Sequence, residues 1–432
     1  MIISRYTEPI QDLTGNYYLF NCLTRKWICL DPKLYDMVLQ YHDKIEVIES
    51  IHPDFFKILK DEKFIVNTPI QDSQNGLQYV GDSFNSFDNV VITINPTLDC
   101  NLRCWYCYEQ RHKNSVMSQS VLKDSINYIT SFLREKSIKS LRLSFFGGEP
   151  LLYYKKIISP IIESIKQECN ITNTKLYITF TTNGLLITDS ILEDLLDISS
   201  NVNFQIAFDG ARDYHNKVKS LGANFSCYDK AISNSINAIK KGYNVIVRCN
   251  YNKSTVSSFI DVVDDLRDYH RCPNLRFLFQ RIWQENEDEE MMSLRKSLIN
   301  SIDAHYKINS NLHTLLGNSL YKCYADYKYN IVINYDGLIY KCTARDFVEK
   351  NSIGHITKDG CVYKQSYLNL ISERALYGER CSKCRILPIC PNCSQVRIEH
   401  GFDSCPINID EAGMRRNIRA AFRDITNIPI DI

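Results

Sequence analysis

The stretch Asn95-Pro-Thr-Leu-Asp-Cys-Asn-Leu-Arg-Cys-Trp-Tyr-Cys-Tyr-Glu109 decides how this chain folds. It follows the apolar run Val90 to Ile94 and spaces Cys100, Cys104 and Cys107 as C-x3-C-x2-C. Three close thiolates suit an iron–sulfur cluster in which one iron has no protein ligand. A zinc knuckle or a chance grouping is the alternative, but a structural zinc site takes four ligands and this stretch offers three. An open iron is a place where a small molecule can bind and be cleaved.

Composition places the chain among ordinary globular proteins. Its 432 residues, 44% of them hydrophobic and 23% charged, suffice for about two to four domains with real cores. The formal net charge of +1 creates no field that would attract nucleic acid or a membrane surface. The N-terminus lacks the features of a signal peptide, and no run of 18 or more apolar residues appears. We therefore expect a cytoplasmic protein with neither a nucleic-acid nor a membrane partner.

Seventeen cysteines are the second compositional signal. In a chain without an export signal, clustered cysteines are more often metal ligands than disulfides. Three form the triplet, and seven of the eight cysteines from Cys323 to Cys405, all but Cys361, form a second group. The others are scattered, and we expect them to be small buried residues: Cys22, Cys29, Cys169, Cys227, Cys249, Cys272 and Cys361.

Between Val90 and about Gln280, strand patterns alternate with helical patterns. Six strands are expected, at Val90–Ile94, Leu141–Phe145, Leu176–Thr181, Asn203–Phe208, Val245–Asn250 and Leu275–Phe279. Helices are expected in the gaps, at Val121–Leu133, Ile157–Glu168, Ile191–Leu196, Tyr228–Lys240 and Val256–Leu266. Strands that alternate with helices form a parallel sheet. The expected fold class is therefore α/β, with a partial (β/α)6 barrel.

The first 80 residues have a different pattern. Asn16 to Leu30 predicts two strands around a Leu-Thr-Arg-Lys turn. Helices are expected at Pro32–Tyr41, with Asp31 as N-cap, and at Phe55–Leu59. With a closing strand at Lys63–Val66, these elements predict a small winged-helix-like unit.

Three other segments complete the expected organisation. Residues 68–88 are polar and predict a linker. Residues 285–315 are charged and predict a helix, with the charge run Glu285–Glu290 as its solvated start, and Met414–Ile425 predicts a helical tail.

The cysteine spacing resembles the signature of the radical S-adenosylmethionine (SAM) enzymes. In that family three cysteines hold a [4Fe–4S] cluster, and SAM chelates the fourth iron. An electron from the cluster then cleaves SAM to a 5′-deoxyadenosyl radical. The resemblance implies the cluster-binding role for Cys100, Cys104 and Cys107, and it places Tyr106 near the adenine of SAM.

The turn after the second strand resembles the same family. Phe145-Phe-Gly-Gly-Glu-Pro150 matches the Gly-Gly-Glu element that holds the methionine amino group of SAM, which implies that role for Gly147, Gly148 and Glu149. Glycines permit close backbone approach, and a carboxylate accepts from an ammonium group. The alternative is an ordinary turn between a strand and a helix, in which Pro150 begins the helix.

Turns after three later strands imply further SAM contacts. Thr181-Thr-Asn-Gly184 resembles the family's Thr-Asn-Gly turn, in which Asn183 would face SAM. Asp209 matches the family's Ser-x-Asp-Gly, with Ala207 in place of the serine. Arg248 matches Arg-x-Asn and would pair with the SAM carboxylate. For each of them an ordinary turn or salt bridge is an equal alternative.

The C-terminal cysteines resemble the SPASM domain, the auxiliary iron–sulfur module of peptide- and protein-modifying radical SAM enzymes. The first part of the pattern, C-x13-G-x4-C, is formed by Cys323, Gly337 and Cys342. The second part is C-x2-C-x5-C-x2-C and a final cysteine, where the family has three residues in the last gap. It comprises Cys381, Cys384, Cys390, Cys393 and Cys405.

This resemblance implies two auxiliary iron–sulfur clusters. One would be bound by Cys381, Cys384, Cys390 and Cys405, and the other by Cys323, Cys342 and Cys393. The second cluster would keep an open iron or take another ligand such as Cys361. A structural zinc module is the alternative.

The expected domains follow from these patterns. Residues 1–75 would form the winged-helix-like unit, which resembles the peptide-recognition domains of peptide-modifying enzymes; the resemblance implies a leader-peptide recognition domain, and an N-terminal structural cap is the alternative. Residues 88–285 would form the radical SAM core, 315–410 the SPASM domain and 411–432 the helical tail. The implied function is that of a radical SAM oxidoreductase, a maturase that crosslinks a ribosomally synthesised precursor peptide through a thioether or carbon–carbon bond. A flavodoxin or ferredoxin would donate electrons. The sequence names no catalytic base.

Two alternatives remain open. An anaerobic sulfatase maturase oxidises Cys or Ser to formylglycine, but that family has an Asp directly after the G-x4-C cysteine, where this chain has Thr343. A zinc- or cluster-bearing scaffold without SAM chemistry is the other. Gly148 and Glu149, in register with a cysteine triplet, argue against it.

Overall fold

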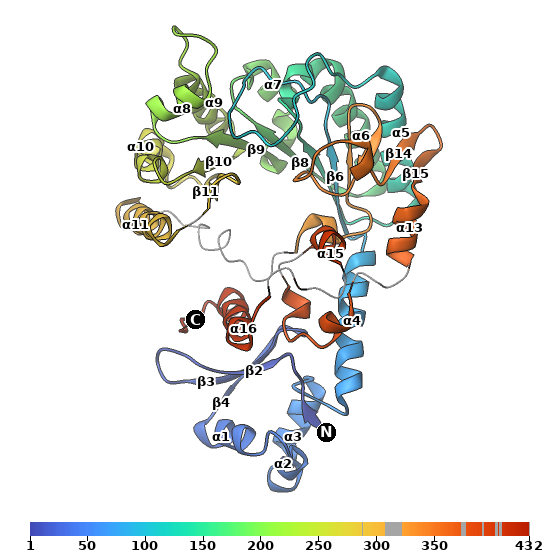
Figure 1. Cartoon of the computed structure of the whole chain (residues 1–432), viewed down its shortest axis with the longest axis vertical. Helices are drawn as coiled ribbons and strands as arrows, with labels where there is room; N and C mark the ends of the chain where they lie inside the picture. Colours follow the sequence, from blue (N-terminus) through green and yellow to red (C-terminus); the bar gives the residue numbers. More distant parts are fainter. Residues whose placement is uncertain are drawn as a thin grey trace. The chain divides into compact units, whose positions relative to one another are not determined.

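The chain divides into two units. The computed structural model describes residues 1–286, 288–306, 322–372, 377–390, 393–401, 405 and 408–431 (Figure 1). Within these, the first unit draws on Met1–Ser86, Gly317–Lys328 and Gln365–Ile432, and the second on Phe87–Leu316 and Tyr329–Lys364. No helix among the described residues combines the length and apolarity needed to cross a bilayer.

The framework of the second unit is a sheet that has ten strands over the described residues. Six parallel strands stand side by side in chain order, and the sheet stays open because its end strands do not pair with each other. The six predicted strands and the partial (β/α)6 barrel are confirmed. The parallel strands are β6 (Asn89–Ile94), β7 (Ser140–Phe145), β8 (Lys175–Thr182), β9 (Val202–Phe208), β10 (Asn244–Tyr251) and β11 (Leu275–Arg281).

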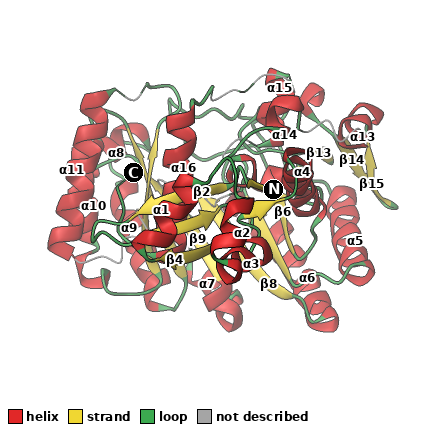
Figure 2. Ribbon diagram, turned by 90° about the horizontal axis from the view of Figure 1, so that it is seen from below, coloured by secondary structure: helices red, strands yellow, loops and turns green. Residues whose placement is uncertain are grey.

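Helices connect these strands and lie outside the sheet (Figure 2). Side chains of Ser118, Thr188 and Ser226 cap the first turns of α5, α7 and α9. The expected helices are confirmed, including one within 285–315, whose residues beyond 306 lie outside the described chain. The helices are α5 (Gln119–Glu135), α6 (Ser159–Thr172), α7 (Asp189–Asp194), α8 (Arg212–Val218), α9 (Cys227–Lys240), α10 (Phe259–Asp265) and α11 (Glu289–Tyr306). Short 3₁₀ or π turns are η1 (Pro150–Tyr153), η2 (Tyr154–Ile158), η3 (Leu196–Asn201), η4 (Val256–Ser258), η5 (Arg267–Tyr269) and η7 (Glu349–Asn351).

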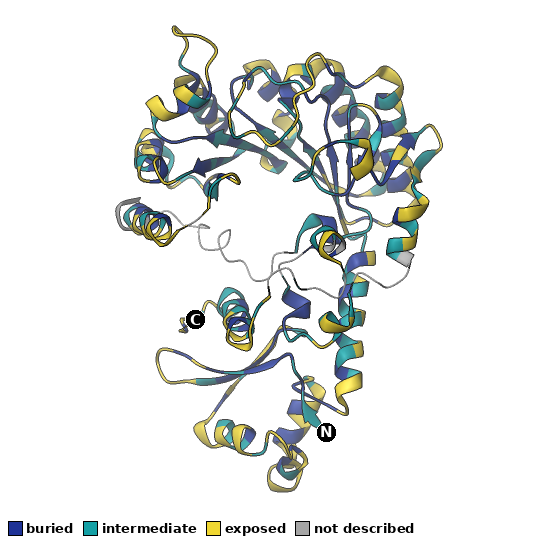
Figure 3. Ribbon diagram, viewed as in Figure 1, coloured by how far each residue is buried: buried dark blue, intermediate teal, exposed yellow. Residues whose placement is uncertain are grey.

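The strands of the sheet are largely buried (Figure 3). Along β9 buried residues alternate with partly buried ones, so the two faces of the strand differ in exposure. Phe204 and Phe208 of β9 are fully buried, whereas Ala207 between them lies on the other face. Phe204 stacks on Phe180 of β8 at 5.1 Å between ring centroids, and Phe180 stacks on Phe145 of β7 at 5.3 Å. This apolar face anchors the strands, so the other face is available to line a site.

The sheet continues beyond β6 with four shorter strands, β12 (Ile331–Ile333), β13 (Leu338–Tyr340), β14 (Gly354–Thr357) and β15 (Gly360–Tyr363). β12 runs parallel to β6, and the later pairs are antiparallel. β12 and β13 form a hairpin whose turn is Asn334–Gly337. Gly337 has φ +85°, a left-handed conformation that favours glycine.

The first unit contains a three-stranded antiparallel sheet, β2-β3-β4. The predicted strand pair and helices are confirmed, and Asp31 accepts from the backbone N–H groups of Lys33 and Leu34 at 2.9 and 3.0 Å. The strands are β1 (Ile2–Ile3), β2 (Thr7–Gln11), β3 (Tyr17–Asn21), β4 (Lys26–Leu30) and β5 (Ile65–Val66). The helices that follow β4 are α1 (Pro32–Gln40), α2 (Glu46–Ile51) and α3 (Pro53–Asp61).

The C-terminal part of the chain completes this unit. Phe422 packs on Tyr18 and Phe20 of β3, with ring centroids 5.3 and 5.6 Å apart. On the other side of the sheet, Leu19 joins the core of Phe56 and its neighbours. The elements are η6 (Tyr324–Asp326), α13 (Gln365–Ser372), α14 (Glu379–Ser382), η8 (Leu387–Ile389), α15 (Ser394–His400) and α16 (Glu411–Thr426).

The linker predicted at residues 68–88 is wrong, because Pro69–Asn85 form a helix, α4. Thr68 caps it by accepting from Gln71 N at 3.1 Å, and Pro69 occupies its first turn. The buried residues recur every four positions at Asp72, Gly76, Val80 and Phe84. Polar composition concealed this stripe, since two of its four members are aspartate and glycine.

Candidate SAM and iron–sulfur site

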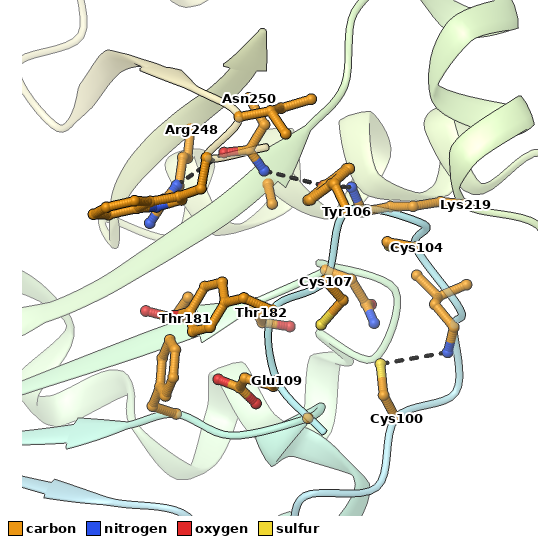
Figure 4. Close-up of a pocket in the computed structure, with 18 of the residues that line it drawn as sticks. Cys100, Cys104, Tyr106, Cys107, Glu109, Thr181, Thr182, Lys219, Arg248 and Asn250 are labelled. Atoms are coloured by element: carbon orange, nitrogen blue, oxygen red, sulfur yellow. Dashed lines mark hydrogen bonds between the residues drawn. The ribbon is translucent and has the colours of Figure 1, made fainter. Parts of the chain in front are cut away.

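The residues predicted to contact SAM and its cluster gather around one cavity at the carboxyl ends of the parallel strands (Figure 4). Ligands of parallel α/β sheets bind at this edge. Glu149 and Asp209 do not line the cavity, but each hydrogen-bonds residues that do. The predicted residues that line it are Cys100, Cys104, Tyr106, Cys107, Gly147, Gly148, Asn183 and Arg248.

An aspartate closes the loop that carries the cysteine triplet. Asp99 accepts from Arg111 Nε, Asn114 N and Cys100 N, each at 2.8 Å. Burial acts to raise the pKa of Asp99, but these hydrogen bonds lower it on balance. The two ends of the loop are thereby tied together. Sequence analysis did not single out Asp99, because a lone aspartate in a loop has no distinguishing pattern.

The three thiols fit an iron–sulfur cluster. Burial raises the pKa of Cys100 to about 12 and also raises the pKa of Cys104 and of Cys107, and such thiols lose their protons readily only to a metal. The Sγ of Cys100 accepts from Leu102 N at 3.4 Å, which orients the sulfur. Within the described chain, no three His, Cys, Asp or Glu side chains converge to hold a single metal ion. A four-iron cluster is bound through separate irons and does not require that convergence.

Two glycines let the turn after β7 pack against the cysteine loop. Gly147 has φ +110°, and a Cβ there would lie 2.2 Å from the Thr97 carbonyl oxygen. A Cβ on Gly148 would lie 2.2 Å from the Asp99 carbonyl oxygen. Gly148 N donates to Thr97 O at 3.2 Å and Glu149 N to Asp99 O at 2.8 Å. Any larger residue would push the two loops apart.

The Glu149 carboxylate is fully buried beneath the cavity and binds the end of β8. It accepts from Thr182 Oγ1 at 2.8 and 3.0 Å, and from Asn183 N at 2.8 Å and Leu151 N at 3.1 Å. Burial raises its pKa to about 7, against the opposing effect of these hydrogen bonds. Its partners in this structure are therefore protein groups, and it positions Asn183, whose Nδ2 donates to Asn101 Oδ1 at 2.8 Å.

A buried ion pair holds Tyr106. Asp209 accepts from the Tyr106 hydroxyl with one carboxylate oxygen and from Lys219 Nζ with the other. The Lys219 and Asp209 side chains are only 3% and 2% exposed. Burial acts to lower the pKa of Lys219, but Asp209 and Tyr106 raise it on balance, so the lysine is a cation. Sequence analysis missed Lys219, which stands ten positions from its partner in no recognised motif.

Two further side chains bind Tyr106, Asn250 from β10 and Gln284 from the loop after β11. Asn250 Nδ2 donates to the Tyr106 hydroxyl at 3.1 Å, and Arg248 Nε donates to Asn250 Oδ1 at 3.0 Å. From the loop after β11, Gln284 Nε2 donates to the Tyr106 carbonyl at 2.6 Å. The aromatic ring is therefore fixed at both its hydroxyl and its backbone.

Glu109 adds a carboxyl group that the sequence analysis did not single out. It lines the cavity, and its Oε2 is buried with no hydrogen-bond partner among the described residues. Burial raises its pKa to about 8. The cavity thus contains an acceptor or donor that a bound molecule can use.

The C-terminal cysteines of the first unit fall into two sets. Cys323 and Cys393 share a side-chain hydrogen bond, and we call them the paired thiols. Cys381, Cys384 and Cys405 interact electrostatically with one another. Together with Cys390 they are called here the four-cysteine group, which contains the ligands predicted for one auxiliary cluster.

Cys342 and Cys361 belong to the second unit. The Sγ of Cys342 accepts from Ala344 N at 3.3 Å, and its charge acts on Tyr108, which lines the cavity. Cys361 lies on β15 and hydrogen-bonds Tyr128.

Comparison with known proteins identifies the central segment. Residues 94–266 match the family model of the radical SAM superfamily. The radical SAM cyclopropyl synthase TigE of Paramaledivibacter caminithermalis is 24% identical over 308 residues, which cover 61% of this chain and 63% of TigE. The chain therefore spans less than two thirds of that relative. The cysteine-type anaerobic sulfatase-maturating enzyme of Clostridium novyi is 24% identical over 334 residues, 68% of this chain and 84% of that enzyme.

Solved structures share the fold. Streptococcus suis SuiB bound to precursor peptide SuiA gives a TM-score of 0.54 at 18% identity, covering 93% of this chain and 97% of SuiB. SuiB bound to S-adenosylmethionine gives 0.52. The matched segment contains the cysteine triplet, the Gly-Gly turn and four of the six parallel strands, β7 to β10. The central segment of this chain, residues 94–266, is therefore similar to the radical SAM superfamily.

Proposed function

We propose that this protein is a radical SAM oxidoreductase that installs a thioether or carbon–carbon crosslink in a ribosomally synthesised precursor peptide. The observation that carries the proposal is the single cavity shared by the cysteine triplet, the Gly-Gly turn and Asn183. Bound there, a [4Fe–4S] cluster and SAM would supply a 5′-deoxyadenosyl radical that can take hydrogen from an unactivated C–H bond.

The residues of the cavity would bind and orient these groups. Cys100, Cys104 and Cys107 would hold the cluster. Gly148 offers backbone at close range for the methionine part of SAM, and Tyr106 offers a fixed aromatic ring for the adenine. Because Tyr106 is held at both ends, this ring needs little reorganisation when SAM binds.

Polar groups further along the strands would bind the rest of SAM. Glu149 fixes Asn183 at the end of β8, where the amide faces the cavity. Arg248 is a partly buried cation on the cavity wall and suits the SAM carboxylate. Asp209 contributes by holding Tyr106 in place.

A precursor peptide is the proposed partner. SuiB, which shares this fold, was solved with its precursor peptide bound. In this chain β4 is an end strand of its sheet over the described residues and is largely exposed, so a leader segment can add to its outer edge as a further strand. We assign this proposed role to residues 1–75.

A flavodoxin or ferredoxin is the proposed electron donor. The 17 free cysteines support a reducing compartment such as the cytoplasm.

Two auxiliary iron–sulfur clusters complete the proposal. The four-cysteine group would hold one of them, and its mutual electrostatic effects support that assignment. The paired thiols, with Cys342, would provide ligands for the other, and their shared hydrogen bond supports it. Soft thiolate donors of this kind suit iron–sulfur clusters.

The match to the Clostridium novyi enzyme favours a second candidate, oxidation of a cysteine to formylglycine. Thr343 argues against it, because the residue after Cys342 would be the aspartate that serves as base in the maturases. Threonine has no group that can take a proton near neutral pH.

Anaerobic reconstitution tests the proposal. We expect the full chain, given iron, sulfide, SAM, a reductant and a candidate precursor peptide, to release 5′-deoxyadenosine and to yield a peptide lighter by one hydrogen pair. A Cys100→Ala, Cys104→Ala, Cys107→Ala variant should release none. Conversion of a peptide cysteine to an aldehyde would establish the second candidate. Bound zinc without SAM cleavage would refute both and indicate a scaffold.

A further inference from the structure

A short segment with two of the predicted cluster ligands is bound to the N-terminal sheet of the first unit. Residues 381–385 contain the first two members of the four-cysteine group, and we call them the ligand segment. Arg385 ends this segment, and its side chain is only 18% exposed. Its Nε donates to Arg5 O at 3.0 Å, and its Nη2 donates to Thr7 O of β2 at 3.3 Å. One guanidinium thus binds the backbone of an end strand of the sheet.

A buried carboxylate completes this contact. The Glu8 side chain of β2 is fully buried, and its Oε2 accepts from Arg385 Nη2 at 2.7 Å. Its Oε1 accepts from Arg415 Nη1 of α16 at 3.3 Å. A buried carboxylate is costly without its cationic partners, so Glu8 holds the Arg385 guanidinium in place. The arginine therefore fixes the ligand segment on β2.

The sheet also binds the backbone of the ligand segment. Arg5 Nη1 donates to Ser382 O at 3.2 Å, and Cys22 Sγ, just after β3, donates to Arg385 O at 3.5 Å. Asp72 of α4 accepts from Arg5 N at 2.7 Å and so holds that residue as well. Because each side supplies donors to the other, disorder on either side leaves polar groups on the other side without partners.

The ligand segment makes a turn between its two cysteines. Cys384 N donates to Cys381 O at 3.0 Å. A cluster bound by both thiolates would lock this turn, because metal binding at cysteines supplies free energy to the folding of the segment that holds them. The apolar side chains that follow the segment share a core with the aromatic side chains of β3, and they are Ile386, Leu387 and Ile389. The turn, the arginine and the sheet therefore form one continuous set of contacts.

We propose that Arg385 links the auxiliary cluster of the four-cysteine group to the binding of the precursor peptide. In this arrangement the cluster fixes the ligand segment and Arg385 holds β2 against that segment. The leader segment adds to β4, the other end strand of the same sheet over the described residues. Two ligands that bind the same ordered state stabilise each other, so bound peptide slows the loss of the cluster. This inference rests on the auxiliary cluster and the leader-binding role of the proposed function.

Hydrogen–deuterium exchange of the iron-loaded full chain tests the link between Arg385 and the sheet. A Cys100→Ala, Cys104→Ala, Cys107→Ala background leaves only the auxiliary iron. In this background Arg385→Gln should speed exchange of the β2 and β3 amides about tenfold, because charged hydrogen bonds to β2 are lost. The strands β8 and β9 of the second unit are an internal reference and should keep their exchange rates. Unchanged exchange in β2 and β3 would overturn the inference.

Release of the auxiliary iron to a chelator tests the link in the other direction. The phase of release that disappears in Cys384→Ala belongs to the four-cysteine group. Arg385→Gln should speed this phase about tenfold, since a loosened sheet no longer holds the ligand segment. A synthetic leader segment of a candidate precursor peptide, at about ten times its Kd, should slow this phase about tenfold in the background chain. It should slow the phase much less in Arg385→Gln.

Two further variants separate the arginine from its surroundings. Arg385→Lys keeps a cation beside Glu8 and should restore part of the protection from exchange and part of the iron retention. Lys383→Gln is the matched control, because Lys383 lies between the two cysteines, is exposed and pairs with Glu379. It should leave both the exchange rates and the iron release unchanged.

The outcomes separate the inference from the proposed function. Iron content that accounts for no auxiliary cluster refutes the auxiliary part of the proposed function and this inference with it. A leader segment that does not bind the chain, as measured by fluorescence anisotropy, refutes the leader-binding role and again the inference. A leader segment that binds but leaves iron release unchanged refutes the inference alone. Equal effects of Arg385→Gln and Lys383→Gln also refute it, because the link would then not depend on Arg385.

Discussion

At the scale of single residues, the cavity depends on charged groups that no motif announces. Lys219 and Asp209 form a buried pair that holds Tyr106, and Asp99 closes the cysteine loop. Each of these charged residues stands alone in the sequence, and most of its partners lie at distant positions in the chain. Sequence patterns report spacing along the chain, so they cannot report which buried charge is neutralised by which.

Replacement of Lys219 by methionine should destabilise the second unit strongly. It would leave the Asp209 carboxylate buried and unpaired, which costs about 3–5 kcal/mol of unfolding free energy. Urea unfolding measures this loss. Lys217→Met, at an exposed position of α8, is the control and should change stability by less than about 0.5 kcal/mol. Equal losses in the two variants would contradict a structural role for the Lys219–Asp209 pair.

Glu149 should make stability fall as the pH rises from about 4.5 to about 7. Its pKa is about 7 when folded against a usual value of 4.5, so the unfolded chain releases this proton first. Ionisation of Glu149 lowers the free energy of unfolding. This loss is absent below about pH 4.5 and complete above about pH 7, where it reaches about 3 kcal/mol. Glu149→Gln cannot titrate, so unfolding free energies measured across this range should fall less steeply than in the wild type. Parallel pH profiles would show that this carboxyl titrates normally.

At the scale of elements, the parallel sheet follows from alternation of patterns, whereas α4 depends on contacts that composition hides. Gly76 faces the ring of Tyr6 so closely that a Cβ would lie 1.9 Å from the hydroxyl oxygen. Gly81, five residues along the same helix, has nothing within 4 Å of a Cβ position. Close packing therefore requires glycine at position 76, whereas position 81 has room for a larger residue.

Alanine at these two glycines should have opposite effects. Gly76→Ala should destabilise the first unit by about 1–3 kcal/mol, because the fully buried Tyr6 has to move. Gly81→Ala should stabilise it by up to about 1 kcal/mol through helix propensity alone. Chemical denaturation of the two variants measures both signs. If Gly76→Ala stabilised the first unit, the Tyr6 ring would be able to move away from the new Cβ without a loss of stability.

At the scale of the whole molecule, the two ends of the chain build one core. The ring of Phe422 in α16 packs on Tyr18 and Phe20 near the N-terminus, and the side chain is fully buried. The predicted helical tail is thus the cover of one face of the N-terminal sheet.

Phe422→Ala should cost about 3–5 kcal/mol in the stability of the first unit, because a large buried ring is removed from a packed core. The exposed Arg416 on the same helix provides the control, and Arg416→Ala should cost less than about 0.5 kcal/mol. Limited proteolysis should show earlier cleavage within residues 1–86 in Phe422→Ala. Unchanged cleavage there would mean that α16 does not support the N-terminal sheet.

The sequence by itself determined the parallel sheet and the place of the cysteine triplet on it. These features are local: strand and helix periods repeat within a few residues, and Cys100, Cys104 and Cys107 lie within one loop. Only the tertiary structure decided that the Glu149 carboxylate accepts hydrogen bonds from Thr182 and Asn183. It also decided which charges meet in the interior and that α16 covers the first sheet. Those outcomes depend on burial and on partners far apart in the chain, which spacing alone does not encode.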